Sequence, residues 1–300
     1  MYQQNGILLI DKNKGETSFD VVRKVKGVLP GIKIGHAGTL DPFATGLLII
    51  LLGQGTKLSS FLMAGEKKYQ ATVKLGVATD TLDPTGKIVS TEPVPDFSLG
   101  QILECTEKFV GMTEQSPPVF SALRFNGRRS YELARKGIEV ELSKREINIR
   151  SIEITSFKLP HFTFEVTCSS GTYIRSLAAD IGKSLGSCAH LCKLKRLASG
   201  AYNVKDGLNS DSIDVLKNSQ SLQEKVISLS NALHYMKEVS LDRMAAKKIK
   251  NGLKSALFEI INNQDIPEEW SGNIKLVCEN NLVAIIWIEF RQVRKIKVFQ

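Results

Sequence analysis

The stretch GHAGTLDPFATGLL, residues 35–48, places one carboxylate in a loop that runs directly into an apolar segment. That carboxylate is Asp41, and Pro42 after it disfavours helical backbone angles at the aspartate. The three glycines of the stretch permit a positive φ or the close approach of another backbone segment. Residues 47–52, LLIILL, are typical of a buried strand. The pattern favours an acidic side chain fixed on a tight loop at the edge of a strand, which suits a catalytic carboxylate. The alternative is an ordinary Asp-Pro turn whose carboxylate caps a local amide.

Composition limits the class of protein. A chain of 300 residues can form one large domain and one small one. Hydrophobic residues make up 42% of it, which allows a packed core and argues against wholesale disorder. The 40 basic residues outnumber the 31 acidic ones and give a formal net charge of +9. A basic excess of this size favours a polyanionic partner such as a nucleic acid.

The cysteines and the apolar segments indicate a reducing compartment. The cysteine count is five, an odd number, and no Cys-x-x-Cys pair occurs. Cys188, His190 and Cys192 lie close together, but a zinc site would need a second ligand pair elsewhere in the chain. No apolar run approaches the roughly 20 residues of a membrane span, and residues 1–18 lack the pattern of a signal peptide. We therefore predict a cytoplasmic protein with free thiols, no membrane association and no metal.

Hydrophobic periodicity predicts an α+β fold with a mixed, largely antiparallel sheet. Alternating apolar residues predict strands at residues 69–75 and 162–168. Valines at helical spacing from residue 21 predict a helix capped by Thr17 or Ser18. A further helix is predicted from residue 174, and the strands and helices show no regular βαβ alternation.

Ser98 and Gln101 have the spacing of a capping box. The helix that they open is predicted to carry one apolar face, formed by Ile102, Leu103, Thr106, Phe109 and Val110.

Basic and aromatic residues alternate at about residues 115–142. This combination suits neutralisation of a nucleic-acid backbone together with base stacking. The alternative is a solvated loop with a short helix. The residues concerned are Phe120, Arg124, Phe125, Arg128, Arg129, Tyr131, Arg135 and Lys136.

The last part of the chain predicts a separate β-rich module. Residues 203–223 are rich in Asn, Ser and Asp and are interpreted as a connection. A basic helix is expected over residues 242–250, and residues 279–281 form the expected turn of a hairpin. We place the large domain at residues 1–235 and the small one at 238–300.

Several motifs together resemble the TruB family of tRNA pseudouridine synthases. They are the stretch at 35–48, GILLIDKNKGETSFD at 6–20, Lys68-Tyr69, CSSGTYIRSLAADIG at 168–182, LKRLASG at 194–200 and the insertion at 116–137. The resemblance implies the pseudouridine synthase fold followed by a small C-terminal PUA-like domain. The chain departs from the family pattern at four positions, where it carries Asn13 for Pro, Lys195 for Arg, Phe120 for Tyr and Arg124 for Lys.

The resemblance also implies roles for residues of the candidate active site. Asp41 would be the nucleophile, and Arg175 its ion-pair partner, because an adjacent guanidinium favours the ionised carboxylate. Tyr69 would stack on the target base and assist proton transfer. From the residues alone, Tyr69 would be assigned to the core as a tyrosine on a strand, and Arg175 could equally lie on the surface of an amphipathic helix.

Three further residues are expected to bind the substrate. By resemblance, Tyr173 and Leu194 would line the uracil pocket, and His36 would lie against the RNA. As isolated residues, Leu194 would be assigned to the core and His36 to a local hydrogen bond that holds its loop.

The implied reaction is the isomerisation of uridine to pseudouridine at position 55 in the T-loop of tRNA. The nucleotide is flipped out, Asp41 attacks, the glycosidic bond breaks and C5 of the base bonds to C1′ of the sugar. Whether Asp41 attacks C1′ or C6, or whether the reaction passes through a glycal, stays open. The implied enzyme is a monomer that binds the tRNA T-arm without a guide RNA and needs no cofactor.

Three alternative functions stay open at this point. A glycosidase or base-excising glycosylase would need a second carboxylate as general acid, for which Asp80, Asp83 and Asp180 are candidates. A non-catalytic RNA-binding protein would show the same basic and aromatic segment. A guide-RNA-dependent pseudouridine synthase of archaea and eukaryotes would share the catalytic motifs.

Overall fold

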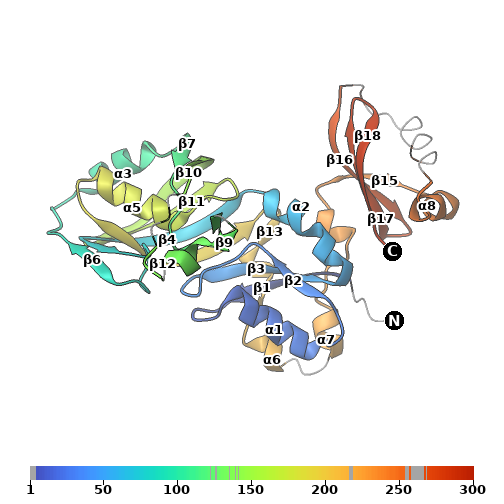
Figure 1. The fold of residues 1–300 in the computed structure, drawn as a ribbon, viewed down its shortest axis with the longest axis horizontal. Helices are drawn as coiled ribbons and strands as arrows, with labels where there is room; N and C mark the ends of the chain where they lie inside the picture. The colour runs from blue at the N-terminus through green and yellow to red at the C-terminus, as the bar shows by residue number, and fades with distance from the viewer. Residues whose placement is uncertain are drawn as a thin grey trace.

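A computed structural model describes residues 5–121, 123–125, 127–134, 136–138, 140, 142–215, 219–253, 257, 267 and 269–300. A ten-stranded sheet forms the larger part of the molecule (Figure 1). Its main path runs β14-β1-β3-β12-β4-β11-β10-β7, while β2 pairs with β3 and β13 pairs with β12. The strands are β1 (Gly6–Lys12), β2 (Ile34–Ala37), β3 (Thr45–Leu52), β4 (Lys67–Leu75), β7 (Gly111–Gln115), β10 (Arg145–Lys158), β11 (His161–Cys168), β12 (Ala189–Ser199), β13 (Tyr202–Asn203) and β14 (Leu208–Asn209).

Only the pairs β1–β14 and β12–β3 are parallel in this sheet, and its other pairs are antiparallel. The predicted α+β class with a mixed, largely antiparallel sheet is therefore confirmed. The helices of this part are α1 (Ser18–Val28), α2 (Ser59–Ala64), α3 (Leu99–Glu107), α4 (Ser130–Ala134), α5 (Ile174–Ser184), α6 (Ser212–Val215) and α7 (Ser219–Gln223), with 3-10 helices η1 (Gly53–Leu58), η2 (Val204–Asp206) and η3 (Asn231–Leu233).

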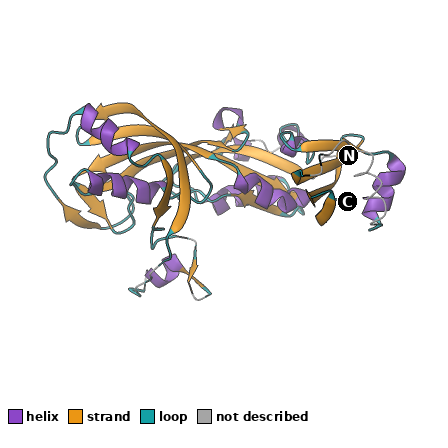
Figure 2. Cartoon of the chain, turned by 90° about the horizontal axis from the view of Figure 1, so that it is seen from above, coloured by secondary structure: helices purple, strands orange, loops and turns teal. Residues whose placement is uncertain are grey.

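Two small hairpins extend from this body. One pairs β5 (Val77–Thr79) with β6 (Ile88–Thr91), and the other pairs β8 (Arg124–Phe125) with β9 (Arg128–Arg129). The second hairpin and α4 form the expected insertion, which projects from one side of the sheet (Figure 2).

A second sheet follows near the C-terminus. It has the order β15-β16-β17-β18, and the helix α8 accompanies it. The bounds are β15 (Lys237–Ser240), α8 (Arg243–Lys250), β16 (Ser271–Cys278), β17 (Asn281–Glu289) and β18 (Gln292–Val298). Glu279 and Asn280 have φ values of 49° and 64°, as a tight two-residue hairpin turn requires. The predicted β-rich module with its hairpin is confirmed.

The central strands are buried on both faces, which explains their unbroken apolar sequence. In β3, Leu48 and Ile50 belong to the core beneath α1, α3 and α5, whereas Leu47 and Ile49 belong to a second core on the opposite face. The alternation follows from the two-residue period of a strand. The run at residues 47–52 thus lies inside the large sheet and is covered on both faces.

The second core is shared between the two sheets. It contains Val277, Leu282, Ile285 and Phe299 of the C-terminal part together with Leu51 and other residues of the large sheet. Gln54 joins both ends of the chain at this junction: its amide nitrogen Nε2 donates to the Gln300 carbonyl at 2.6 Å, and its backbone N–H donates to Asn5 Oδ1 at 2.8 Å. The C-terminal part is therefore packed onto the large sheet over an apolar contact.

Two local predictions are confirmed and two are wrong. Thr17 caps α1, and Ser98 forms the capping box of α3 with Gln101. The predicted apolar face of α3 is wrong in part, because Leu103 is exposed and the helix ends before Val110. Residues 203–223 are more than a connection, since β14 pairs with β1 inside the large sheet. Strands of two residues carry too little periodicity to be recognised in a sequence.

Among the residues that are described, no helix has the length and apolar character needed to cross a membrane.

Candidate active site

The loop that carries Asp41 connects β2 with β3, and the start of α1 holds it in place. Ser18 Oγ accepts a hydrogen bond from the Leu40 N–H at 2.9 Å, and the Pro42 carbonyl accepts one from the Gly15 N–H at 2.7 Å. Inside the loop, the Ala44 N–H donates to the Asp41 carbonyl at 3.0 Å. The residues on either side of Asp41 are thus tied to a second segment of the chain.

Glycine is required where the loop enters β3. Gly46 has a φ of 102°, and a Cβ added there would lie 2.3 Å from the carbonyl oxygen of Arg196. The strand β12 pairs in parallel with β3 at this point, and Arg196 faces Gly46 in the register. The glycine therefore permits a backbone approach that any side chain would block.

Arg175 lies beside Asp41, as the sequence predicts. It stands in the first turn of α5, and its Nε is 2.9 Å from Asp41 Oδ2. Only 5% of Arg175 is exposed, so the alternative of a surface arginine is wrong. Its two terminal nitrogens donate to the carbonyls of Thr81 and Phe120, each at 2.9 Å. One guanidinium thereby joins the Asp41 loop, the Thr81 turn and the root of the insertion.

A second carboxylate, Asp83, completes this network. Asp83 Oδ2 lies 3.5 Å from Arg175 NH1, and Asp83 is buried. Its other oxygen, Oδ1, accepts hydrogen bonds from Thr81 Oγ1 at 2.7 Å and from the Thr85 N–H at 2.9 Å. The sequence shows Asp83 only as part of an Asp-Pro-Thr-Gly turn. Nothing local reveals that the turn folds back onto α5.

Burial dominates the electrostatics of Asp41. Desolvation raises the pKa of its carboxyl, and the charge of Asp83 raises it further. Arg175 and Lys12 act in the opposite direction without cancelling the effect of burial. Arg175 thus favours the ionised form of the Asp41 carboxylate. The net pKa of Asp41 nevertheless stays above its ordinary value, because burial outweighs the effect of Arg175. About a third of the Asp41 side chain is exposed, so a substrate can reach it.

Lys12 is a buried cation that sequence reasoning missed. It is fully buried at the end of β1, and its Nζ donates to the carbonyls of Asn13 at 2.9 Å and Glu16 at 2.7 Å. Burial lowers its pKa to about 8, against the favourable charges of Glu16 and Asp41. Lys12 lies within the motif at residues 6–20, but nothing in that motif shows that its side chain is buried.

Tyr69 and Leu194 lie on neighbouring strands. Tyr69 is half-buried on β4 opposite Arg196 of β12, and Leu194 is opposite Ala71 in the same pairing. Burial raises the pKa of the Tyr69 phenol, while the charge of Arg196 opposes the rise. Leu194 is 9% exposed and belongs to the core.

Tyr173 and His36 occupy different edges of the site. Tyr173 is the N-cap residue of α5, where the side-chain amide of Gln115 accepts from its N–H at 2.8 Å and donates to its carbonyl at 3.0 Å. His36 is half-buried on β2, and burial together with Arg196 lowers its pKa. Within the described ranges, His36 Nδ1 is buried without a hydrogen-bond partner. Among the described residues, this nitrogen thus makes no hydrogen bond that could hold the loop, as the alternative role of His36 would require.

The insertion is anchored next to Arg175. Ser176 Oγ donates to the Ser116 carbonyl at 2.9 Å, which adds to the bond between Arg175 and the Phe120 carbonyl. Arg128 and Lys136 are exposed. Arg135 lies outside the described residues, as do the side chains of Arg124, Arg129 and Tyr131.

The cysteine and histidine pattern forms no metal centre in the part of the chain that the structure covers. His190 Nδ1 lies 2.8 Å from the Val77 carbonyl, and all five cysteines are free thiols.

Comparison with known proteins agrees with this geometry. A model of the TruB family pseudouridylate synthases (N-terminal domain) matches residues 23–174. A tRNA pseudouridine synthase B of Clostridium kluyveri is 45% identical over 249 residues, which cover 83% of this chain and 84% of that protein. One from Geobacter sulfurreducens is 37% identical over 281 residues, which cover 94% and 92%.

Among solved structures, a chain from a Cbf5-Nop10-Gar1 complex is similar with a TM-score of 0.69 and 22% identity, covering 100% of this chain and 85% of that one. At this identity the likeness concerns the fold. The match to the family model and the sequence relatives show that the chain belongs to the TruB family of pseudouridine synthases.

Proposed function

We propose that this enzyme isomerises the uridine at position 55 in the T-loop of tRNA, as a monomer and without a guide RNA. The observation that carries the proposal is the Asp41–Arg175 ion pair, held at a partly exposed position. The charge of Asp41 also acts on the Tyr69 phenol. Sequence relatives at 37–45% identity that are named tRNA pseudouridine synthase B support the substrate class. The chain of the Cbf5 complex is only 22% identical, so the guide-dependent alternative is less favoured.

Substrate binding would begin with the flipped nucleotide. Unstacking a base costs a few kcal/mol, and the basic surface would offset this cost by contacts with phosphates. Tyr69 would stack on the uracil, while Tyr173 and Leu194 would line the walls of the pocket. His36, whose lowered pKa keeps the imidazole neutral, would lie against the RNA without adding charge.

Asp41 would then act as nucleophile. In the route through C1′, a carboxylate oxygen bonds to C1′ while the N1–C1′ bond breaks, and its electron pair passes to the uracil. The base rotates in the pocket, its C5 bonds to C1′, and the carboxylate leaves. Loss of the C5 proton and protonation of N1 then give neutral pseudouridine. Attack at C6 and a glycal route remain the alternatives.

The environment of Tyr69 defines what its phenol can do. Because burial raises its pKa, the phenol stays protonated at neutral pH. Tyr69 is therefore suited to stacking and to donating a hydrogen bond, and poorly suited to removing the C5 proton.

Base excision is the competing chemistry, and Asp83 is the carboxylate it would require. Asp83 is buried, and its oxygens are engaged by Arg175, Thr81 and Thr85. A general acid must reach the leaving group, so this arrangement favours a role for Asp83 in orienting Arg175.

The decisive experiment incubates the purified protein with a tRNA transcript labelled in uracil and no other RNA. We expect pseudouridine at position 55 and no free uracil. Asp41→Asn should abolish product while tRNA affinity stays within about threefold. Asp96→Asn, at an exposed aspartate, is the matched control. Full activity of Asp41→Asn would overturn the assignment of the nucleophile, and release of uracil would overturn the reaction.

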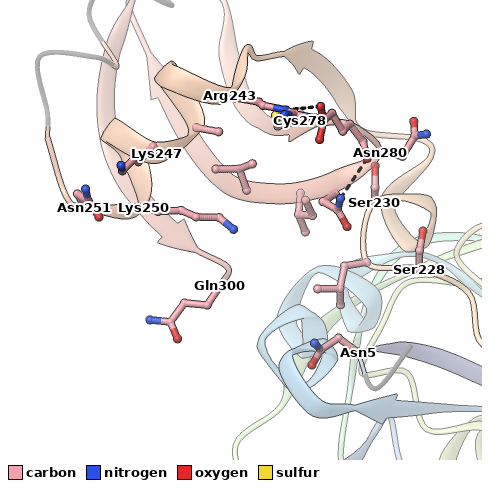
Figure 3. Close-up of a pocket in the computed structure, with 16 residues that line it drawn as sticks. Asn5, Ser228, Ser230, Arg243, Lys247, Lys250, Asn251, Cys278, Asn280 and Gln300 are labelled. Atoms are coloured by element: carbon pink, nitrogen blue, oxygen red, sulfur yellow. Dashed lines mark hydrogen bonds and ion pairs between the residues drawn. The ribbon is translucent and has the colours of Figure 1, made fainter. Parts of the chain in front are cut away.

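For residues 238–300 we propose a PUA-like, RNA-binding role. A hollow of about 930 Å³ separates α8 from the segment around Ser228 (Figure 3). Arg243, Lys247 and Lys250 of α8 line it, and Lys250 points into the open space. Arg243 is paired with Glu279 at 2.6 Å, whereas within the described chain neither Lys247 nor Lys250 has an ion-pair partner. Unpaired lysines along a hollow are suited to phosphate groups.

The test replaces both lysines in the full-length enzyme. Lys247→Glu with Lys250→Glu should weaken tRNA binding and reduce the slope of log K against log salt by about 2, while the rate with saturating tRNA is retained. Lys87→Glu with Lys158→Glu, at two exposed lysines of the large domain, is the control of equal charge. An unchanged salt slope in the α8 variant would contradict the proposed contact.

A further inference from the structure

Arg196 is a buried cation that the proposed reaction does not use. Only 2% of the residue is exposed, and within the described chain no carboxylate forms an ion pair with it. Burying a charge without a counter-charge is costly, and an apolar residue could fill the same space at lower cost. The arginine therefore calls for an explanation in terms of its contacts.

Its side chain holds both ends of the Asp41 loop. Arg196 Nε donates to the Leu47 carbonyl at 2.7 Å, and NH2 donates to the Gly38 carbonyl at 3.1 Å. Gly38 precedes Asp41 by three residues, and Leu47 follows it within β3. A guanidinium can make these two bonds at once because its donors diverge in a rigid plane.

The backbone of Arg196 fixes the same loop at a third point. As described above, it lies so close to Gly46 that no Cβ fits between them. Gly38 also has a positive φ, 93°, and a Cβ there would stand 3.5 Å from Arg196 NH1. The two glycines that bound the loop thus both face Arg196.

Arg196 is also opposite Tyr69 in the pairing of β12 with β4. Its charge acts on the Tyr69 phenol and on the His36 imidazole, and it lowers the pKa of both groups. The same charge acts on the buried amino groups of Lys12 and Lys67. One side chain consequently connects the loop of the nucleophile with the residue expected to stack on the base.

We propose that Arg196 is the positioning residue of this active site, which fixes the place of Asp41 relative to Tyr69 by holding the carbonyls of Gly38 and Leu47. The inference rests on the proposed function, because it presumes that Asp41 is the nucleophile. Arg196 acts through the loop and does not itself touch the substrate.

The test compares Arg196→Met and Arg196→Lys with Lys193→Met, a control at an exposed residue of the same strand. Single-turnover rates with saturating enzyme, tRNA Kd values and hydrogen exchange are measured for each folded variant. A displacement of about 1 Å can cost about 100-fold in rate. For Arg196→Met we expect a loss of about this size, a Kd within about threefold of wild type, and faster exchange confined to residues 38–47. Arg196→Lys keeps the charge without the fork and should recover only part of the rate.

Each outcome decides the matter. A wild-type rate in either Arg196 variant would overturn the proposal, as would a weakened Kd with an unchanged saturating rate. If Arg196→Met does not fold, Arg196→Lys decides alone, and failure of both to fold counts for a purely structural role. Asp41→Asn distinguishes a failure of the proposed function from a failure of the inference about Arg196. Activity in Asp41→Asn refutes the proposed nucleophile. An inactive Asp41→Asn together with a fully active Arg196→Met refutes only the role of Arg196.

Discussion

Asp41 is surrounded by groups whose effects on its ionisation oppose one another. Burial and the charge of Asp83 raise its pKa, and Arg175 and Lys12 lower it. A nucleophilic carboxylate must be ionised, so the rate should fall as the pH drops through this raised pKa. The acidic limb of the rate profile should therefore lie above the range of an ordinary aspartate.

Removing the charge of Asp83 should move the acidic limb of the pH–rate profile. Asp83→Asn takes away a charge that raises the pKa of Asp41, so the limb should shift to lower pH. The plateau rate should also fall, because Arg175 loses a partner. Single-turnover rates over a pH series measure both effects. Asp80→Asn, in the same turn but outside the Arg175 network, should leave the limb in place, and an equal shift there would contradict the local explanation.

The buried lysines should make the free energy of unfolding depend on pH in the alkaline range. Lys12 has a folded-state pKa of about 8, below its unfolded value of 10.5. Between these values the unfolded chain binds more protons, so the free energy of unfolding should rise with pH. The loss of stability caused by burying the charged amino group of Lys12 is fully present below pH 8. Lys67 has the same shift and should contribute in the same sense.

Lys12→Met isolates this contribution. The free energy of unfolding of the wild type relative to Lys12→Met should increase by about 2 kcal/mol from pH 8 to pH 10. Urea unfolding over this range measures it, with Lys14→Met at an exposed lysine as the control. A difference that stays constant with pH would show that folding does not lower the pKa of Lys12, which then stays charged in the folded protein over this range.

Residue types identified the candidate site only in part. Asp41 and Arg175 belong to long motifs, and the structure brings them to 2.9 Å. Lys12 and Arg196 lie within the quoted motifs, but neither these motifs nor the turn of Asp83 shows the contacts that matter, because those contacts come from the segments that the fold places beside them. A lysine or an arginine in a strand pattern is normally assigned to the surface, since burial of an unpaired charge is rare.

At the scale of elements, the junction of the Asp41 loop with β3 is the most restricted backbone. Gly46→Ala would combine a positive φ with a Cβ 2.3 Å from the Arg196 carbonyl oxygen. We expect a loss of about 3 kcal/mol or more in the free energy of unfolding, measured with urea. Gly111→Ala is a matched control, because Gly111 has a φ of 109° with open space around it. The control should cost only about 1–2 kcal/mol, and equal losses would refute the steric argument.

Elements with strong periodicity could be predicted, and short or irregular ones could not. The run at residues 47–52 and the capped start of α1 follow from local rules that the tertiary structure reinforces. The face of α3 was predicted too wide because its apolar residues span more of the helix than the sheet covers. The strand β14 depends on a partner 198 positions earlier, as the pairing of Ile10 with Leu208 shows, and no local pattern encodes it.

At the scale of the whole molecule, the two sheets share one core. Phe299→Ala removes a fully buried ring from it and should cost about 3–5 kcal/mol in the free energy of unfolding. Because the core is shared, fluorescence and circular dichroism should follow one common transition. Phe290→Ala, at an exposed phenylalanine of the same sheet, should change little. Separate transitions of the two parts would contradict the shared core.

This contact also changes how the C-terminal part can be studied. On the proposed RNA-binding role, deletion of residues 238–300 would chiefly weaken tRNA binding. The structure indicates that the deletion would also expose Leu51 and its neighbours in the second core. Charge changes on α8 are therefore the cleaner test of RNA binding.

The same contact restrains the distance between the basic helix α8 and Asp41. Two parts joined by a flexible linker could adjust their separation to any RNA, but here the basic helix and Asp41 belong to one packed body. The shared core restrains the span between them. If α8 contacts RNA as proposed, an RNA bound at both places presents its target uridine and a second phosphate group at that span. The junction would then allow selection of a folded RNA by its three-dimensional shape, in addition to the sequence around the uridine.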